Sequence, residues 1–308
     1  MSSTANHVAA AGCRWAALLL ALAGCRAAPE PARIHCAALD IGGADLAELR
    51  AAFVANNPGY DLAFVPGCRE LAPASQDRVL FVQGPATRSA APTVGDVLLV
   101  RAGASWRSPD DGALDLLAFS LPEPLPAELP DEIRPDWDPR ITDTPGGCAT
   151  ETGAYRRILL TWQPEKGPYV LHALNAHRVR ITDSFSHYHP VRGGFDEFYL
   201  VQMAPPEARL LTSTQVPAIE ARAVTREQVA GLIESRPLRV GDLVYLPRGT
   251  MHRGLGGALV QVISVPGFVP NTEIGVDHHL LAINGALGLQ GDERLPVNVV
   301  AARTKVVK

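Results

Sequence analysis

The stretch from His187 to His252 constrains the fold of this chain more than any other. It opens with His187 and His189, which are separated by a single residue. Residues two apart on a β-strand point to the same face, so the two imidazoles would project side by side, roughly 6.6 Å apart along the strand. Such a pair can chelate a metal ion, and it requires a strand to hold it. The pattern therefore favours an all-β fold around a metal site.

Two further potential ligands follow. Glu197 precedes the apolar run 198–201, and His252 comes after a Pro-x-Gly turn. Three imidazoles and one carboxylate suit a borderline divalent transition metal and leave coordination positions open. Asp196 stands directly before Glu197, and the residues alone leave open which of the two carboxylates is the ligand.

The order of these residues resembles the cupin superfamily, whose motifs read His-x-His-x(3,4)-Glu and Gly-x5-Pro-x-Gly-x2-His. Residues 241–252 match the second motif in full, whereas seven residues separate His189 from Glu197 in the first, as if a loop had been inserted. The resemblance implies jelly-roll (double-stranded β-helix) barrels and favours Glu197 over Asp196. It also implies the full ligand set: His187, His189, Glu197 and His252.

The chain contains an internal repeat as well. Residues 77–83 align with 196–202 at an offset of 196 − 77 = 119, and residues 95–107 align with 241–253 at an offset of 241 − 95 = 146. A repeat of this size predicts two similar units, here two cupin barrels in one chain.

The ligand positions differ between the two copies. In the first copy Arg78 stands at the position of Glu197. Trp106 stands at the position of His252. Neither an arginine nor an indole is a usual metal ligand. We therefore expect only the second barrel to bind metal.

These patterns predict an organisation in five parts, with a few short helices beside the strands. They are a signal peptide with a lipobox, a tether, a degenerate cupin-like barrel, a Pro-rich linker, and a metal-binding barrel with an inserted segment and a C-terminal helix: residues 1–25, 26–33, 34–121, 122–150 and 151–308. The inserted segment lies within 204–239, and whether it is a lid or packs on the barrel exterior stays open.

The N-terminus is typical of a processing signal. Arg14 precedes the apolar run 15–23, which is too short to span a bilayer as a permanent helix. The run ends in Leu-Ala-Gly-Cys at Cys25, which resembles a bacterial lipobox. The resemblance implies an exported lipoprotein, anchored in a membrane by lipid on Cys25 and facing the periplasm or another extracytoplasmic space. Simple secretion is the alternative. The pairing of Cys36, Cys68 and Cys148 stays open.

Composition limits the partners. The net charge of 28 − 32 = −4 provides no basic stripe for nucleic acid. We expect a small-molecule substrate, and contact with a membrane through the lipid anchor only. Pairing of two chains through the barrels stays open.

The expected function is that of a metal-dependent enzyme, an oxygenase, decarboxylase or isomerase acting on a small oxygen-rich molecule. The resemblance places Fe or Mn first, with Ni, Cu and Zn also open. Tyr199, inward by alternation with Glu197, and Gln261, aligned with the inward Leu116, are expected to orient the bound group. The alternatives are a non-catalytic module that binds a small molecule through the metal, and a structural metalloprotein with a closed site.

Overall fold

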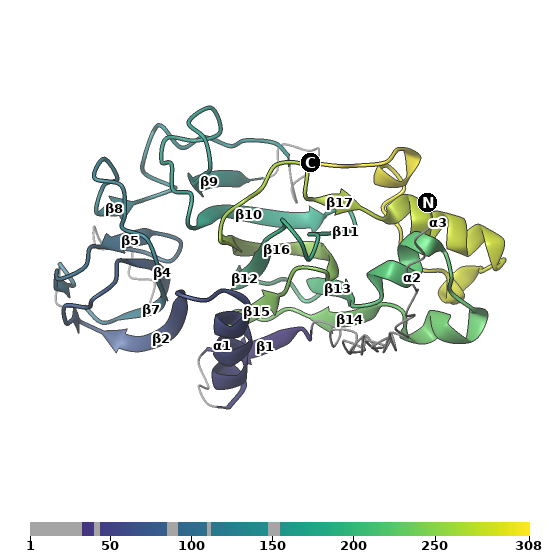
Figure 1. Cartoon of the computed structure of the whole chain (residues 1–308), viewed down its shortest axis with the longest axis horizontal. Helices are drawn as coiled ribbons and strands as arrows, with labels where there is room; N and C mark the ends of the chain where they lie inside the picture. Colours follow the sequence, from purple (N-terminus) through teal and green to yellow (C-terminus); the bar gives the residue numbers. More distant parts are fainter. Residues whose placement is uncertain (1–32, 40–43, 85–91, 110–111, 147–154) are drawn as a thin grey trace, which may run out of the picture. The chain divides into compact units, whose positions relative to one another are not determined.

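The computed structural model describes residues 33–39, 44–84, 92–109, 112–146 and 155–308, and within them the chain is mostly β-strand (Figure 1). In chain order the strands are β1 (His35–Ala38), β2 (Asp61–Cys68), β3 (Glu70–Leu71), β4 (Arg78–Gly84), β5 (Val97–Val100), β6 (Trp106–Arg107), β7 (Leu114–Ser120), β8 (Glu132–Ile133), β9 (Arg156–Leu160), β10 (Asn175–Asp183), β11 (His187–Tyr188), β12 (Asp196–Met203), β13 (Arg209–Ser213), β14 (Glu234–Pro237), β15 (Asp242–Leu246), β16 (Met251–Val265) and β17 (Ile274–Gly275). The helices are α1 (Ala44–Asn56), α2 (Val216–Ala221), α3 (Asp277–Ala286) and the 3-10 turns η1 (Arg226–Gly231), η2 (Gly291–Glu293) and η3 (Ala301–Arg303). The predicted all-β fold class is confirmed.

The larger sheet is organised around β16. The main path of this sheet is β1-β15-β12-β16-β10-β9. The first part of β16 pairs with β11 and β13, and its later part pairs with β10 and β12. Gly256 and Gly257, with φ of 80° and 83°, separate the two parts. A Cβ on Gly256 would lie 2.4 Å from the carbonyl oxygen of Glu207, so this position requires glycine. One long strand thus serves both ends of the jelly roll.

The two faces of the larger sheet bury different apolar clusters. On β12, Tyr199 and Val201 belong to the cluster inside the barrel. Phe198 and Leu200 belong to the cluster that faces the smaller sheet. Because side chains alternate along a strand, Glu197 lies on the same side as Tyr199, toward the barrel interior.

The smaller sheet has the order β2-β7-β4-β5-β8, and its centre repeats the pairing of the larger sheet. Arg78 of β4 pairs with Val100 of β5, and Glu197 of β12 pairs with Leu246 of β15. These partners differ by 197 − 78 = 119 and 246 − 100 = 146, the two offsets of the sequence repeat. The aligned segments therefore form equivalent strand pairs in the same register. The organisation into two separate barrels stays a prediction, and β1 pairs with β15 of the second half.

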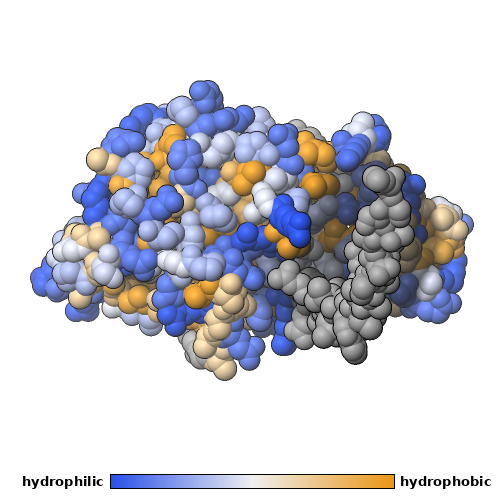
Figure 2. All heavy atoms as spheres, in the orientation of Figure 1, coloured by the Kyte–Doolittle hydropathy of each residue, from blue (hydrophilic) through white to orange (hydrophobic). Residues whose placement is uncertain are grey.

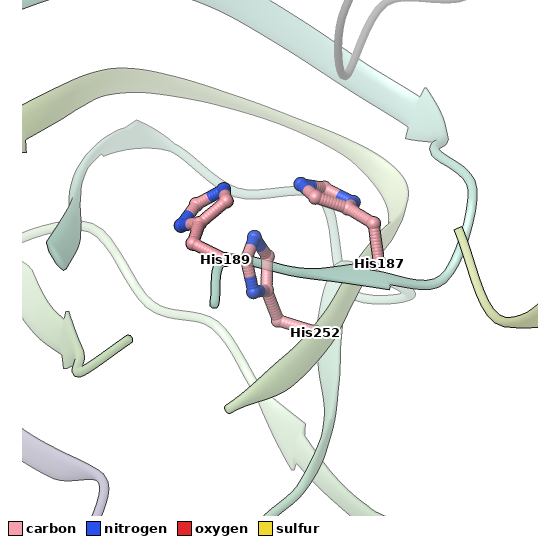
Figure 3. A group of neighbouring side chains, drawn as sticks. All are labelled: His187, His189 and His252. Carbon is pink, nitrogen blue, oxygen red and sulfur yellow. The ribbon is translucent and has the colours of Figure 1, made fainter. Parts of the chain in front are cut away.

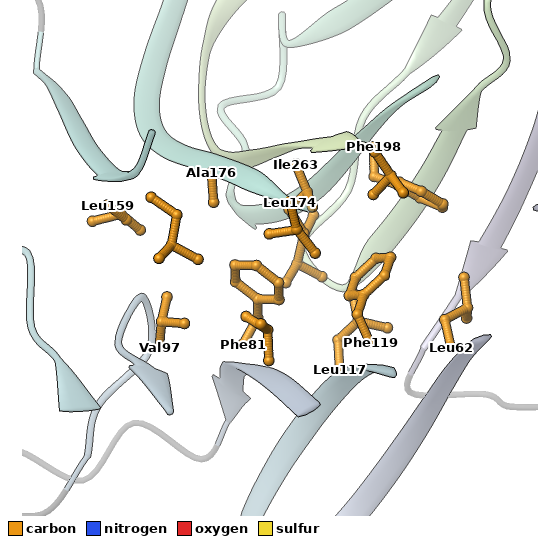
Figure 4. Packing of buried hydrophobic residues seen from close by; sticks show 14 of the residues in the cluster. Leu62, Phe81, Val97, Leu117, Phe119, Leu159, Leu174, Ala176, Phe198 and Ile263 are labelled. Atoms are coloured by element: carbon orange, nitrogen blue, oxygen red, sulfur yellow. The ribbon is translucent and has the colours of Figure 1, made fainter. Parts of the chain in front are cut away.

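Aromatic side chains join the two sheets (Figure 4). Phe119 of β7 packs edge-on against Phe81, Phe53 and Phe198, with ring centroids 5.8, 5.8 and 5.2 Å away. All four rings are fully buried. Each sheet therefore covers an apolar face of the other.

Two predicted elements differ from the structure. The apolar residues of segment 169–174 predict a strand, but the segment makes only an isolated bridge between Thr161 and Val170. Its apolar residues are buried in the cluster between the two sheets without joining a sheet. Packing in this cluster is enough to explain why they are hydrophobic. In the inserted segment residues 225–228 predict a capping box that opens a helix through Ser235, but the structure has the short 3-10 turn η1 followed by the strand β14. The predicted cap is present, since the Gln228 side chain accepts a hydrogen bond from the Thr225 amide at 2.9 Å.

Hydrophilic residues cover most of the described surface on the face shown in Figure 2, with apolar residues scattered among them. None of the described helices has the length and apolar character needed to cross a membrane. The predicted signal peptide, including Cys25, lies outside the described residues, as does Cys148. Cys36 and Cys68 are free thiols.

Replacing Phe119 with alanine should destabilise the protein by about 3–5 kcal/mol, because it leaves a cavity in the cluster that joins the sheets. Urea unfolding followed by circular dichroism measures this change. The control is Trp137→Ala, whose side chain is 69% exposed, and we expect a change within about 1 kcal/mol there. Equal effects of the two substitutions would contradict the proposed role of the cluster.

Candidate metal centre

Three histidines meet inside the second half of the chain (Figure 3). His187 of β11 is paired directly with His252 of β16, and His189 follows β11. All three are buried, and their candidate ligand atoms lie within 4.8 Å of one another. The sequence pattern placed these three imidazoles on neighbouring strands, and the structure brings them together.

Backbone carbonyl groups orient two of the rings. The Nδ1 atom of His187 lies 3.1 Å from the Phe185 carbonyl oxygen, and that of His252 lies 3.2 Å from the Thr250 carbonyl oxygen. A carbonyl oxygen can only accept, so each Nδ1 carries the proton and each Nε2 is left with a lone pair. Backbone contacts of this kind orient metal-binding histidines.

Phenylalanine rings stack on two of the histidines. Phe185 stacks on His187 at 4.3 Å, and Phe195 stacks on His189 at 3.8 Å between ring centroids. Burial and the neighbouring His252 lower the pKa of both His187 and His189 well below the usual histidine value. Both rings are therefore neutral at physiological pH, which is the form that binds metal.

Glu197 completes the cluster. Its Oε1 lies 3.2 Å from Nε2 of His252, and its Oε2 lies 3.8 Å from Nε2 of His189. Nε2 of all three histidines and Oε1 of Glu197 are buried and have no hydrogen-bond partner in the protein. Buried polar atoms without partners are costly unless something satisfies them. One divalent metal ion held by the three imidazoles, with the Glu197 carboxylate beside His189 and His252, would satisfy them, so these residues fit such an ion.

Asp196 is occupied elsewhere. Its Oδ1 accepts hydrogen bonds from the backbone amide and Nε of Arg248, at 2.9 and 2.8 Å. Its Oδ2 accepts from the Tyr245 hydroxyl at 2.7 Å and from Nδ2 of Asn57 at 2.6 Å. Both oxygens are therefore used, and Glu197 is the carboxylate that faces the histidines.

A second buried carboxylate supports the strand that carries His187. Asp277, in the first turn of α3, accepts hydrogen bonds from the amide and the hydroxyl of Ser186, at 2.7 and 2.8 Å. It also accepts one from the Asn298 amide at 2.8 Å. The sequence pattern predicts Asp277 as the cap of a helix, but the N-cap of α3 is Val276 and makes no side-chain cap bond. The Asp277 carboxylate instead fixes Ser186, the residue before His187.

A cavity of about 420 Å³ adjoins the cluster, and Glu197 forms part of its wall. Glu273 lines the same cavity, and burial together with the negative charge of Glu197 raises its pKa to about 7. Glu273 lies in an irregular segment before β17 and has no motif around it, so sequence reasoning missed it. The candidate site thus opens to a space that can hold a small molecule.

Tyr199 lies beside the cluster, as its alternation with Glu197 predicted. Its ring is fully buried and stands perpendicular to that of His252, with centroids 6.1 Å apart. The ring also belongs to the apolar cluster inside the barrel. Tyr199 is thus placed to hold the His252 ring in position, and its assignment as a catalytic residue stays a prediction.

The expected orientation of Gln261 was wrong. Its Nε2 donates to the carbonyl oxygen of Gly95, and its Oε1 accepts from Nε2 of Gln202, both at 2.8 Å. These partners lie between the two sheets, on the face of β16 that points away from the barrel interior. The amide is fully used there and does not face the histidines.

A shift of one residue explains the error. The expectation matched Gln261 with Leu116. In the structure Val260 pairs with Val201, and Leu116 pairs with Val82, which is the repeat equivalent of Val201. Leu116 therefore corresponds to Val260, and a shift by one residue moves a side chain to the other face of a strand.

No protein-family model matches the sequence, and no curated protein matches it. Among solved structures, a mutant of oxalate decarboxylase from Bacillus subtilis resembles the chain with 13% identity and a TM-score of 0.42, over 77% of this chain and 74% of that one. A formate complex of the Lactobacillus farciminis oxalate decarboxylase has 15% identity and a TM-score of 0.43, over 75% and 85%. Procruciferin, an 11S globulin from Brassica napus, has 11% identity and a TM-score of 0.44, over 83% and 87%. Likeness at this level establishes neither a family nor an activity.

Replacing Asp196 with alanine should destabilise the protein by about 3–5 kcal/mol, because it leaves the partly buried Arg248 without its carboxylate. Urea unfolding measures the loss. The matched control is Asp131→Ala, which breaks an ion pair with Arg101 at a position where the aspartate side chain is 89% exposed. We expect that control to cost at most about 1 kcal/mol. If Asp196→Ala lowers the free energy of unfolding no more than the control does, the proposed role of Asp196 in holding Arg248 is wrong.

Proposed function

We propose that this protein is a metal-dependent enzyme that acts on a small oxygen-bearing molecule by decarboxylation, isomerisation or oxygenation. The proposal rests on the position of Glu197, which both faces the histidines and lines the cavity. A molecule in the cavity would thus lie next to the ion that these residues would hold.

The chain would hold the ion through His187, His189, Glu197 and His252. When bound, the metal would supply Lewis acidity that polarises an oxygen atom of the bound molecule. Glu273 lines the same cavity and can exchange a proton with a bound molecule through its carboxyl group. Decarboxylation and isomerisation both need a proton to be given to carbon or taken from it, and this residue favours those two reaction types.

The position of Glu197 also helps to judge the two alternative functions, a structural metal site and a non-catalytic binding module. A structural metal site is usually closed by four protein ligands and does not open to a cavity. The cavity therefore disfavours a purely structural role. A non-catalytic binding module would need the same cavity, so turnover is what separates it from an enzyme.

The identity of the ion is a proposal that rests on the resemblance to cupins, with Fe or Mn first and Ni, Cu or Zn as alternatives. Imidazole and carboxylate ligands bind all of these ions. The affinities of the ions follow a general order that this ligand set does not change, so the ligands alone do not identify the metal. Comparing turnover after reloading with each ion would identify the functional metal.

Purified protein that is stripped by a chelator and reloaded should hold about one ion per chain, because the described residues offer one cluster of three histidines. His252→Ala should lower the metal content at least tenfold, by loss of a ligand. His278→Ala, in the first turn of α3, is the control and should load normally. Elemental analysis by mass spectrometry gives the stoichiometry, and loading of His252→Ala equal to wild type would exclude the cluster as the site.

The activity test uses the reloaded protein with a library of hydroxy acids, dicarboxylates, sugars and phenolics, following CO2 release, O2 uptake and product masses. Turnover that is lost in His252→Ala supports the enzyme. Saturable binding without product supports the binding module instead, and a site that neither binds these molecules nor exchanges a bound water would be structural.

We further propose that the chain is exported and anchored by lipid on Cys25, as the lipobox resemblance suggests. Full-length protein made in a bacterium that processes lipoproteins should partition into the detergent phase of Triton X-114, because acyl chains favour it. Cys25→Ser should move the protein to the aqueous phase, with Cys36→Ser as the matched control. A wild-type protein found only in the aqueous phase would favour simple secretion.

A further inference from the structure

Resting on the proposed function, we propose that the cavity beside Glu197 binds an organic carboxylate, whose acid group is received by Trp162 and His177 at the end away from the metal ligands. The substrate would then be an acid that reaches the metal through a second oxygen-bearing group. The proposal stands on unpartnered polar atoms, their spacing, and the charges around the cavity.

Two polar side chains in the cavity wall lack partners. Nε1 of Trp162 and Nε2 of His177 are buried and make no hydrogen bond to the protein. An indole N–H can only donate, so the group that satisfies Trp162 must be an acceptor. Buried donors without partners are rare in native proteins, and a carboxylate is the acceptor that they bind most strongly. Nε2 of His177 can serve as a second donor in the tautomer that carries the proton there.

The strand register separates His177 from Glu197. Glu197 pairs with Ser264 of β16, and Ser264 pairs with Asn175 of β10. His177 is two residues further along β10, on the face that also carries Val179 of the barrel interior. Glu197 and His177 are thus two strands apart, roughly 10 Å in the direction of the sheet hydrogen bonds. A ligand with polar groups at both ends can bridge this spacing, whereas a single small ion cannot.

The charges around the cavity favour an anion. Arg156, Lys166 and Lys308 contribute cationic side chains to its wall, beside the carboxylates of Glu197 and Glu273. A divalent metal held by Glu197 would add further positive charge. An acid would be attracted to these cations, and a neutral polyol would gain nothing from them.

The carbon skeleton of the ligand also has a surface to contact. The rings of Trp162 and Phe268 stack with centroids 4.1 Å apart, and both line the cavity with Ile158. The stacking fixes the indole plane, so its N–H keeps one direction. The wall thus combines an apolar surface with a fixed donor, an arrangement that suits a short-chain acid better than a sugar.

The test measures binding rather than turnover. Isothermal titration is carried out on wild type, Trp162→Phe and His177→Leu with the dicarboxylates from malonate to adipate and with their diamides. Trp162→Phe keeps an aromatic ring to stack on Phe268 and removes the N–H together with part of the ring. The matched controls are Trp137→Phe and His172→Leu, at exposed positions outside the cavity wall.

At least one dicarboxylate should bind wild type about tenfold more tightly than its diamide, and each cavity substitution should weaken this binding about tenfold. The controls should stay within about twofold of wild type. Diamides or sugar alcohols binding as tightly as the acids, no binding of any acid, or cavity variants that bind like wild type would each overturn the proposal.

Metal loading of every variant is measured in parallel, and the titrations are repeated on metal-free protein. Acids should still bind the metal-free protein, more weakly, because Trp162 and His177 remain. If wild type fails to load metal, the proposed function fails, while the metal-free titration still decides the carboxylate site. If wild type loads metal and no acid binds in either form, the carboxylate site fails and the metal site stands.

Discussion

The four hydrogen bonds accepted by Asp196 tie together the parts of the chain on which the site depends. Their donors come from the turn before His252, from β15 and from the end of α1. Burying a carboxylate costs several kcal/mol unless its oxygens are satisfied, and here each oxygen accepts two donors. Because Glu197 follows Asp196 directly, fixing one carboxylate fixes the direction of the other.

This interaction also makes the first half of the chain part of the site. Asn57 directly follows α1, donates to Asp196 and accepts from Nη2 of Arg248 at 2.6 Å. Within α1, Phe53 packs edge-on against Phe198 at 5.1 Å. The described residues of the first half hold no such histidine cluster, yet they supply an amide and a ring that hold the loops around it. The first half thus contributes to the site through hydrogen bonds and packing.

The sequence was most informative where the period of a strand and a motif act together. Alternation along β12 placed Glu197 and Tyr199 on one face, and the two offsets of the repeat reappear in the strand register. Gln261 failed because an alignment that is wrong by one residue exchanges the faces of a strand. Glu273 and Trp162 could not be found in this way, because they lie outside regular strands and only the folded chain brings them to the cavity.

The glycine pair in the middle of β16 divides that strand into two stretches with different duties. Residues before the pair include His252, which belongs to the histidine cluster. Residues after it include Gln261, which lies between the two sheets, and Ser264, which pairs with Glu197 and lines the cavity. Because Gly256 and Gly257 adopt a backbone conformation that other residues rarely reach, the junction between the two stretches depends on this pair. The two glycines thus join His252 to the strand partner of Glu197.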